Sequence, residues 1–224
     1  MSEESVLVFV VDDDPSVRRA LTRLIRLAGH EVEAYGSARE FLEHARAGHA
    51  PACVVLDVQL PDLSGLELQR ELDARLPIIF LTGHGDIAMT VGAIKAGASD
   101  FLTKPVRDDD LLRAIDQALA RSVEISKSMH ELEELRSRVG RLTVREREVM
   151  NLVVLGRLNK QVACELGTVE KTVKAHRARV MQKMEVSSLA ELVRIADKVA
   201  GAKGESHAAE PPHAVPSVLV RNAD

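Results

Sequence analysis

Short apolar runs alternate with segments of helical periodicity along residues 1–122. Five segments have the composition of strands, three of them as continuous apolar runs: Val6–Val11, Glu31–Tyr35, Cys53–Leu56, Ile78–Leu81 and Asp100–Thr103. Apolar spacing or a capping residue marks five helices: Pro15–Ala28, Ser37 to about Ala47, a helix from Ser64, Asp86–Ala96 and Asp108–Arg121. This alternation predicts an α/β fold with a doubly wound, five-stranded parallel sheet.

Polar residues stand where four of these strands end. They are Asp12 and Asp13, Asp57, Thr82 and Lys104. Ligands of such sheets bind at the carboxyl ends of the strands, so we expect these side chains to meet at one edge. Converging carboxylates repel unless a cation neutralises them, and oxygen ligands suit Mg²⁺. The lysine and the threonine hydroxyl are suited instead to binding a phosphoryl group.

The motifs VVDDD, LDVQLPDLSG, LTGHGD and DFLTKP occur in that order over residues 5–122. In sequence and spacing this segment resembles the receiver domain of two-component response regulators, whose sheet has the strand order 2-1-3-4-5. The resemblance implies that Asp57 accepts a phosphoryl group from a sensor histidine kinase. It implies that Mg²⁺ is bound by Asp13, Asp57 and the backbone carbonyl of Gln59, with Asp12 as a ligand directly or through water.

The same resemblance implies that phosphorylation changes the conformation of the domain. Lys104 pairs with the acyl phosphate, and the Lys104–Pro105 bond is expected to be cis. Thr82 moves to bond the phosphate, and Phe101 turns inward to fill the space that the threonine leaves. Gln59 and His84 flank the path of hydrolytic water and tune the lifetime of the phosphorylated state. Without the motif, Phe101 is read as an ordinary core aromatic.

Charge is unevenly distributed along the chain. Residues 1–122 carry 13 basic and 20 acidic residues, a net charge of −7, whereas residues 141–200 carry 12 and 7, a net charge of +5. The total of −4 alone gives no reason to expect nucleic acid. An acidic half followed by a basic half indicates two domains with different partners, although +5 is also compatible with a solvated surface.

Residues 142–199 show only helical periodicity. Thr143 and Glu146 form a capping-box pattern, and a short helix, Asn159–Leu166, is followed by a turn at Gly167 and a basic helix, Glu170–Lys183. This is the pattern of a helix-turn-helix, whose second helix enters the major groove of DNA. The predicted DNA-binding residues are Asn159, Lys160, Lys171, Thr172, Lys174, Ala175, His176, Arg177, Ala178, Arg179 and Lys183.

Residues 141–200 resemble the LuxR-type helix-turn-helix of NarL/FixJ-class regulators. The most specific part is TVKAH with the basic stretch after it, and the motifs TGHGD and HRARVMQKM indicate the FixJ-like branch. The chain departs from the family at Leu158 and Val169, where serine or threonine is frequent. Asn159 and Thr168 are the alternative helix caps. A helical bundle for protein contacts is the competing interpretation.

A helical linker is predicted over residues 123–140. Ile125, Leu132, Leu135, Val139 and Leu142 occupy heptad positions, with Ser128 as a polar member. Three heptads are short for a coiled coil, so a single helix packed on the domains is an equal alternative. The segment 201–224, with three prolines among small polar residues, is expected to be disordered.

Several classes of protein are excluded. The chain has no apolar run of the roughly 18–20 residues that a membrane span needs, and its acidic start is unlike a signal peptide. The widely separated Cys53 and Cys164 are expected to be reduced and largely buried thiols of a cytoplasmic protein. A single tyrosine and no tryptophan argue against a stacking surface for single-stranded nucleic acid.

The leading hypothesis is a transcription regulator, not an enzyme, that is activated when Asp57 is phosphorylated. The receivers then form a homodimer through helix four, strand five and helix five, and the paired modules bind double-stranded DNA at a promoter, with RNA polymerase as a further contact. A DNA-binding regulator independent of phosphorylation is one alternative. An aspartate-nucleophile phosphatase is another, since Asp12 and Asp14 form a D-x-D pattern.

Overall fold

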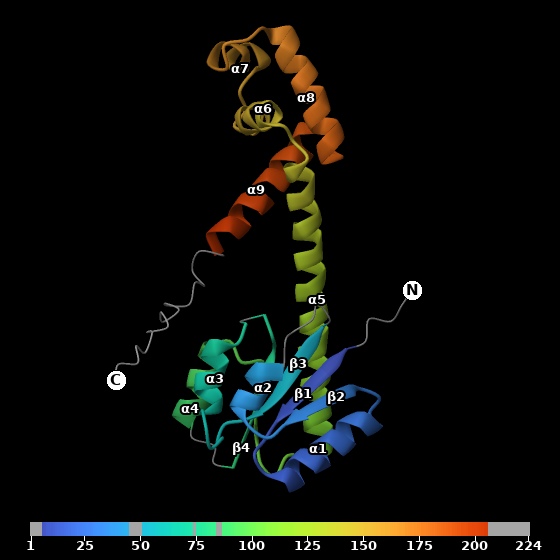
Figure 1. Cartoon of the computed structure of the whole chain (residues 1–224), viewed down its shortest axis with the longest axis vertical. Helices are drawn as coiled ribbons and strands as arrows, with labels where there is room; N and C mark the ends of the chain where they lie inside the picture. Colours follow the sequence, from blue (N-terminus) through green and yellow to red (C-terminus); the bar gives the residue numbers. More distant parts are fainter. Residues whose placement is uncertain (1–5, 45–50, 74, 84–86, 206–224) are drawn as a thin grey trace, which may run out of the picture. The chain divides into compact units, whose positions relative to one another are not determined.

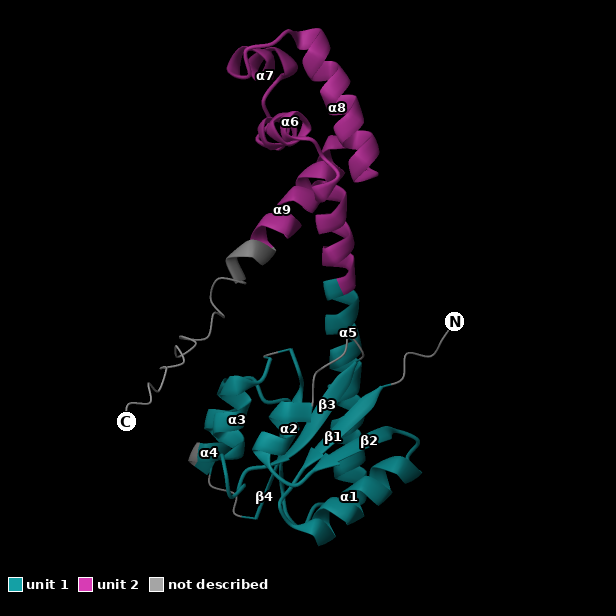
Figure 2. Cartoon of the chain, viewed as in Figure 1, with its two compact units in different colours: residues 1–129 teal, residues 130–224 magenta. Residues whose placement is uncertain are grey.

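The computed structural model describes residues 6–44, 51–73, 75–83 and 87–205. The chain divides into two compact units, Met1–Met129 and His130–Asp224 (Figure 2). His84, the predicted cap Asp86 and residues 206–224 lie outside the described residues.

The first unit contains a five-stranded sheet in the order β2-β1-β3-β4-β5, with every pair parallel (Figure 1). This confirms the predicted fold class and strand order. Its strands are β1 (Leu7–Val11), β2 (Glu31–Tyr35), β3 (Ala52–Asp57), β4 (Ile78–Thr82) and β5 (Asp100–Thr103). The register sets Val11 beside Leu56 and Asp57 beside Leu81, so the strands end close together along one edge.

Helices cover both faces of the sheet because successive strand residues point to opposite sides. Val8 and Val10 belong to a core with α1 and α5, whereas Phe9 and Val11 belong to a second core with the other helices. Figure 1 shows this layering. The helices are α1 (Pro15–Leu27) and α5 (Asp108–Gly140) on one face, and α2 (Ala38–His44), α3 (Gly65–Glu71) and α4 (Ile87–Lys95) on the other.

Local signals explain where two of these helices begin. The Asp14 carboxylate caps α1 by accepting the N–H groups of Ser16 and Val17. Ser64 and Glu67 form a reciprocal capping box at the start of α3. Each cap satisfies backbone donors that have no partner inside the helix.

The helix α5 does not end at Arg121, where the sequence predicts its end, but runs from Asp108 to Gly140, a length of 33 residues. No glycine or proline interrupts residues 108–139, so nothing in the chain stops the helix. Its first turns bury Leu111 and Ile115 in the first unit. Leu135 is buried, and Val139 packs against the core of the second unit. These heptad positions are therefore covered within the chain, which favours the packed helix over a coiled coil.

The second unit is entirely helical over its described residues. After the end of α5 it contains α6 (Val144–Val154), α7 (Asn159–Glu165), α8 (Glu170–Met184) and α9 (Leu189–Glu205). Their core includes Val149, Val162, Val173, Val180 and Leu192. The helix α9 extends into the segment that was expected to be disordered from residue 201. Among the described residues, none of the helices has both the length and the apolar character that a membrane span requires.

The structure confirms one predicted cap and corrects two others. Thr143 and Glu146 form the capping box of α6. The helices α7 and α8 are not capped by Asn159 and Thr168; their N-cap residues are Leu158 and Val169, which make no side-chain hydrogen bond because neither side chain has an acceptor. The Leu158 N–H instead donates to Oε1 of Gln161 at 2.8 Å.

The two cysteines differ in exposure. Cys53 is buried in β3, and burial raises the pKa of its thiol to about 12. Cys164 is exposed on α7, which corrects the expectation that both thiols are largely buried. An exposed position on a short amphipathic helix explains the difference, because its neighbours Val162 and Ala163 fill the core.

Candidate functional site

Four polar side chains converge at the carboxyl edge of the sheet. Asp12 follows β1, Asp57 and Thr82 end β3 and β4, and Lys104 follows β5. Asp12 and Thr82 are each 1% exposed and Asp57 is 8% exposed. The parallel register brings together residues that are up to 92 positions apart in the chain. The structure therefore assembles the constellation that the strand ends predicted.

Lys104 joins the two buried carboxylates. Its Nζ donates to Oδ2 of Asp12 and to Oδ2 of Asp57, each at 2.6 Å. Burial raises the pKa of Asp12, with a smaller contribution from the neighbouring charge of Asp57, and the lysine opposes both. Burial alone would lower the pKa of Lys104, but its bonds to the two carboxylates raise it. The ammonium thus holds two like charges together at the site.

The acidic side chains also fit a divalent cation. Oxygen atoms of Asp12, Asp13 and Asp57 lie within 4.8 Å of one another, and Asp13 is exposed whereas the other two are buried. Oxygen ligands with one side open to water match the preference of Mg²⁺, which keeps several waters when it binds protein. The backbone N–H of Gln59 donates to Oδ1 of Asp57 at 2.9 Å, which orients the central carboxylate.

The predicted switch residues lie on β4 and β5. Lys104 N–H donates to the Thr82 carbonyl at 2.7 Å, which fixes the loop after β5 against the end of β4. Phe101 is half-buried, with its ring centroid 6.0 Å from that of Phe80. The Lys104–Pro105 bond is cis, as the motif implied.

Three residues support the site without having been singled out from the sequence. Arg18 donates to the carbonyls of Asp12 at 2.7 Å and Asp13 at 3.3 Å, so it holds the acidic loop in place. Gly65 lies so close to the end of β3 that an added Cβ would be 2.5 Å from the carbonyl oxygen of Asp57. Gly65 is the last residue of the segment LPDLSG, so its place in this motif is the feature of the sequence that could have identified it.

Asp62 is the third supporting residue. Its carboxylate accepts the N–H groups of Ala38 at 3.3 Å and Arg39 at 2.9 Å, and it thereby ties the loop after β3 to the start of α2. These bonds lower the pKa of Asp62 against the opposing effect of burial. No sequence pattern connects residues 24 positions apart, so this contact was visible only in the structure.

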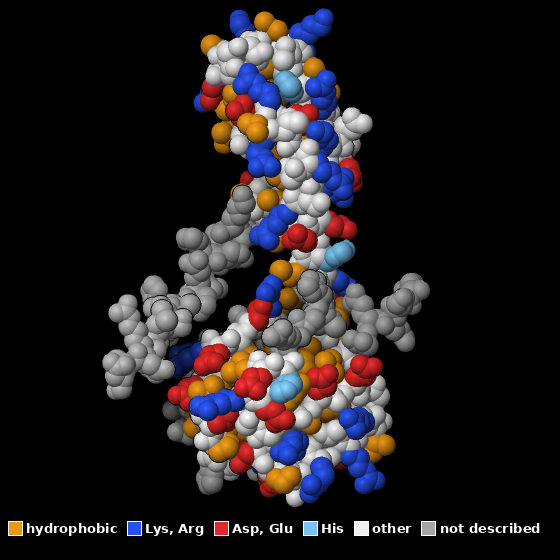
Figure 3. Space-filling model, in the orientation of Figure 1, with side chains coloured by type: hydrophobic (Ala, Val, Ile, Leu, Met, Phe, Trp, Pro, Cys, Tyr) orange, Lys and Arg blue, Asp and Glu red, His pale blue; other side chains and the backbone are white. Residues whose placement is uncertain are grey.

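The second candidate site is the exposed face of α8. Val173 and Val180 point into the core, whereas five of the predicted DNA-binding residues are exposed on the other side: Lys171, Lys174, Ala175, Ala178 and Arg179. Lys160 at the start of α7 is also exposed, and Asn159, Thr172, His176, Arg177 and Lys183 are half-buried. Lys and Arg side chains gather over the face of this unit in view in Figure 3.

Two of the half-buried basic residues have partners inside the unit. Lys183 Nζ donates to Oε2 of Glu146, a residue only 3% exposed, at 2.6 Å. Arg177 donates to Oδ1 of Asn159 at 3.3 Å and thereby links α8 to the start of α7. Lys174 pairs with Glu170 at 3.1 Å across one helical turn, but both side chains are exposed. The ammonium of Lys183 therefore stabilises the fold, and that of Lys174 faces solvent.

Comparison with known families finds a match for each of the two units. Residues 8–116 match the response regulator receiver domain. Residues 141–196 match the family described as bacterial regulatory proteins of the luxR family. These two matches account for the sheet with its acidic edge and for the helical unit, respectively.

Two known proteins are similar to this chain along most of its length. The chain is 50% identical over 194 residues to nodulation protein W of Bradyrhizobium diazoefficiens, covering 85% of each chain. It is 42% identical over 196 residues to the transcriptional regulatory protein FixJ of Azorhizobium caulinodans, covering 86% of this chain and 92% of that protein.

A solved structure extends the likeness to three dimensions. The response regulator StyR is 48% identical with a TM-score of 0.75, and the match covers 87% of this chain and 99% of that one. With a receiver domain, a LuxR-type DNA-binding domain and relatives of this similarity, the chain belongs to the NarL/FixJ class of two-component response regulators, which are DNA-binding transcription regulators.

Proposed function

We propose that a sensor histidine kinase activates this regulator by transferring a phosphoryl group to Asp57. The observation that carries the proposal is the carboxylate of Asp57 at the strand edge, bonded by Lys104 and adjacent to Asp12 and Asp13. Mg²⁺ bound by the three aspartates and the carbonyl of Gln59 would neutralise charge on the entering group. Catalysis at such a site is positioning and charge stabilisation, so the chain assists only its own phosphorylation and dephosphorylation.

The transfer forms one bond and breaks another. An Asp57 oxygen attacks phosphorus, the P–O bond forms, and the P–N bond to the imidazole of the kinase breaks. Lys104 is already positioned 2.6 Å from the nucleophilic carboxylate and pairs with the acyl phosphate. Thr82 then bonds the phosphate and Phe101 turns inward, a shift between two states of the domain. Gln59 and His84 tune the hydrolysis that resets it.

The exposed face of α4 supports dimerisation on phosphorylation. Ile87, Val91 and Ile94 recur at helical spacing and are 81%, 45% and 45% exposed. A stripe of large apolar side chains on one helix face is typical of a protein interaction surface. The switch residue Phe101 lies on β5, which packs against α4. We therefore assign the homodimer interface of the phosphorylated receiver to α4, β5 and the start of α5.

The exposed face of α8 is the proposed DNA-binding surface. Small residues at Ala175 and Ala178 permit close approach to a major groove, and Lys171, Lys174 and Arg179 contact phosphates or base edges. Two modules in a dimer bind two half-sites of a promoter. RNA polymerase is a further partner at that promoter, and the regulator acts in the cytoplasm.

Acetyl phosphate with Mg²⁺ tests the phosphoacceptor. The wild-type chain should acquire one acid-labile phosphate, measured by intact-protein mass spectrometry, and bind promoter DNA more tightly. Asp57→Ala should acquire none, whereas the control Asp109→Ala, an exposed aspartate on α5, should behave as wild type. Phosphate incorporation by the Asp57→Ala variant would refute the assignment.

The same experiment separates the alternatives. A phosphatase built on Asp12 and Asp14 should turn over a phosphoester equally in the Asp57→Ala variant. The structure disfavours that reading, because the Asp14 carboxylate caps α1 and its bonds to Ser16 and Val17 lower its pKa. A regulator independent of phosphorylation should bind DNA with equal affinity in the presence and absence of the phosphodonor.

A further inference from the structure

One helix of the acidic receiver is strongly basic. The helix α1 carries four arginines and no aspartate or glutamate, although residues 1–122 have a net charge of −7. A pocket of about 540 Å³ lies between α1 and the edge strand β2, a volume within the range of about 300–1,000 Å³ that is typical of ligand pockets. Its lining contains no acidic residue and consists of Arg18, Arg19, Thr22, Arg23, Arg26, Leu27 and Ala34.

The arginines of α1 lack the acidic partners that basic residues have elsewhere in the receiver. On α5, for example, Arg113 bonds Asp110 at 2.6 Å. None of the four arginines of α1 has an ion pair with a carboxylate in the described part of the chain. Arg19 and Arg23 are one helical turn apart, and like charges at this spacing repel each other. An anion in the pocket would relieve that repulsion.

The four guanidinium groups differ in how available they are to a ligand. Arg18 is half-buried and donates to two carbonyls of the acidic loop after β1. Arg19, Arg23 and Arg26 are exposed. Arg26 donates to the carbonyl of Val32 at 3.3 Å, which holds its head group beside β2. Arg18 therefore supports the fold, and the other three can bind a ligand.

Phosphate groups are the anions that suit these side chains. A guanidinium stays charged at physiological pH and can donate two parallel hydrogen bonds to phosphate oxygens. Arg19 and Arg26 are separated by about 10 Å along the helix axis, with Arg23 between them. Their positive charge is thus spread over more than the width of one phosphate group, and a chain of two or three phosphates matches it better.

The pocket also offers apolar surface at the end of α1. Leu27, which follows Arg26, is 76% exposed, and Ala34 on β2 is exposed as well. Covering apolar side chains of this kind with the flat face of a base is favourable. We propose that the pocket binds a nucleoside polyphosphate, with its phosphates on the three exposed arginines and its base against Leu27 and Ala34.

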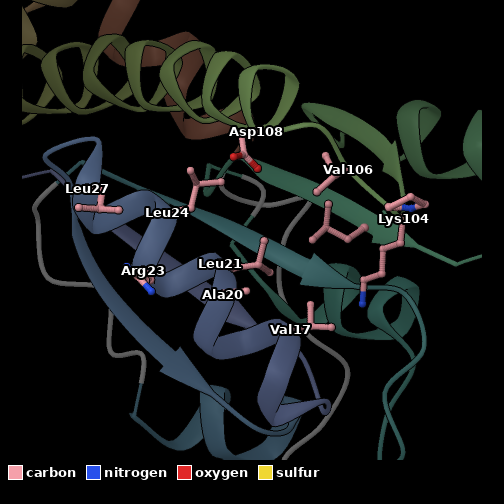
Figure 4. Close-up of a pocket in the computed structure, with 11 residues that line it drawn as sticks. Val17, Ala20, Leu21, Arg23, Leu24, Leu27, Lys104, Val106 and Asp108 are labelled. Atoms are coloured by element: carbon pink, nitrogen blue, oxygen red, sulfur yellow. The ribbon is translucent and has the colours of Figure 1, made fainter.

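The larger pocket beside α1 fits such a ligand less well. It has a volume of about 810 Å³ and lies between α1 and the segment that leads from β5 into α5 (Figure 4). Of the four arginines only Arg23 lines it, and Asp108 adds a negative charge. Figure 4 shows Arg23 well away from Lys104, whose ammonium is bound to the two carboxylates at the edge of the sheet. The phosphates are therefore assigned to the smaller pocket.

Isothermal titration calorimetry of the full-length chain with ATP tests the proposal. Mg²⁺ and phosphodonor are omitted, so that a metal-bridged nucleotide cannot occupy the aspartates at the edge of the sheet. The wild type should bind ATP with a Kd below about 100 μM. Arg19→Ala and Arg23→Ala should each raise that Kd about tenfold, because each change removes a charge-assisted bond to phosphate. Arg113→Ala, an exposed arginine on α5, is the matched control and should leave the Kd unchanged.

Inorganic tripolyphosphate separates the two parts of the ligand. Leu27→Ala should raise the Kd for ATP about threefold and leave the Kd for tripolyphosphate unchanged, because only the nucleotide has a base. Circular dichroism checks that each variant is folded. Equal affinity of the wild type for tripolyphosphate and ATP would overturn the assignment to a nucleotide.

Nuclear magnetic resonance locates the bound ATP. The amide signals of α1 and β2 should shift on addition of ATP, whereas shifts confined to α8, the other basic helix, would overturn the proposal. Absence of binding at about 1 mM ATP, or the same loss of affinity in Arg113→Ala as in Arg23→Ala, would also overturn it. Because neither Mg²⁺ nor a phosphodonor is present, failure here is distinct from failure of Asp57 phosphorylation.

Discussion

Lys104 Nζ lies 2.6 Å from Oδ2 of Asp57 and makes an equally short bond to Asp12. The lysine that we propose to pair with the phosphorylated aspartate is thus also the cation that holds two buried carboxylates together. We therefore expect both the stability of the receiver and its response to phosphorylation to depend on this ammonium group.

Replacing Lys104 with alanine should destabilise the receiver. With the cation removed, Asp12 and Asp57 repel each other at low exposure, so we expect the free energy of unfolding to fall by about 2 kcal/mol at pH 7. Mg²⁺ should recover part of the loss, since it replaces the missing positive charge. Urea unfolding with and without Mg²⁺ measures both effects, and the exposed Lys95→Ala on α4 is the control. Equal stability of Lys104→Ala and wild type in the absence of Mg²⁺ would contradict this account.

Replacing Gly65 with alanine should disturb the phosphoacceptor directly. Its Cβ would lie 2.5 Å from the carbonyl oxygen of Asp57, so the strand end or α3 must shift, at a cost of about 1–3 kcal/mol in unfolding free energy. Phosphorylation by acetyl phosphate should slow as well. Gly92→Ala is the matched control on α4, because nothing lies within 4 Å of its Cβ position. That change should be neutral or stabilising by up to about 1 kcal/mol, since alanine is the better helix former.

The ion pair between Glu146 and Lys183 should make the stability of the second unit depend on pH. Bonds from Lys183 and Thr143 lower the pKa of Glu146 from 4.5 to about 2. A lowered pKa in the folded state means that the stabilisation is present above pH 4.5 and is lost as the pH falls from 4.5 towards 2. The difference in melting temperature between wild type and Glu146→Gln, followed by calorimetry, should shrink over that range. A constant difference from about pH 6 to about pH 2 would exclude this role for the carboxylate.

Two lysines of α8 should respond differently to truncation. Lys174→Ala should weaken binding to promoter DNA and reduce the slope of log K against log salt by about 0.9 for each phosphate that the side chain neutralises in the wild type. Its melting temperature should stay near that of wild type, since the pair with Glu170 is exposed. Lys183→Ala should instead lower the melting temperature, because the buried carboxylate of Glu146 is left without its cationic partner. Fluorescence anisotropy titrations and thermal unfolding distinguish the two; an unchanged salt slope in Lys174→Ala would remove it from the DNA interface.

The sequence alone predicted the alternation of strands and helices, the parallel sheet, the acidic edge and the basic helix of the second unit. Each of these depends on a local pattern: an apolar run, a capping residue such as Ser64, or a polar residue that ends a strand. Local patterns also explain the errors. A helix that ends at Arg121 and a separate helical linker over residues 123–140 were predicted, whereas α5 runs without a break from Asp108 to Gly140 because no glycine or proline interrupts it before its last residue.

Contacts between distant residues were decided only by the tertiary structure. The sequence placed Lys183 among the DNA-binding residues because it is a lysine on a basic helix, but folding brings it to Glu146, 37 positions away. In the same way, Gly65 meets the backbone of Asp57, and Arg23 and Asp108 come to flank one pocket. Hydrophobic periodicity specifies which face of a helix or strand is buried. The partners of a charged side chain depend instead on which helices and strands pack together, and that packing is determined by the contacts of the whole hydrophobic core.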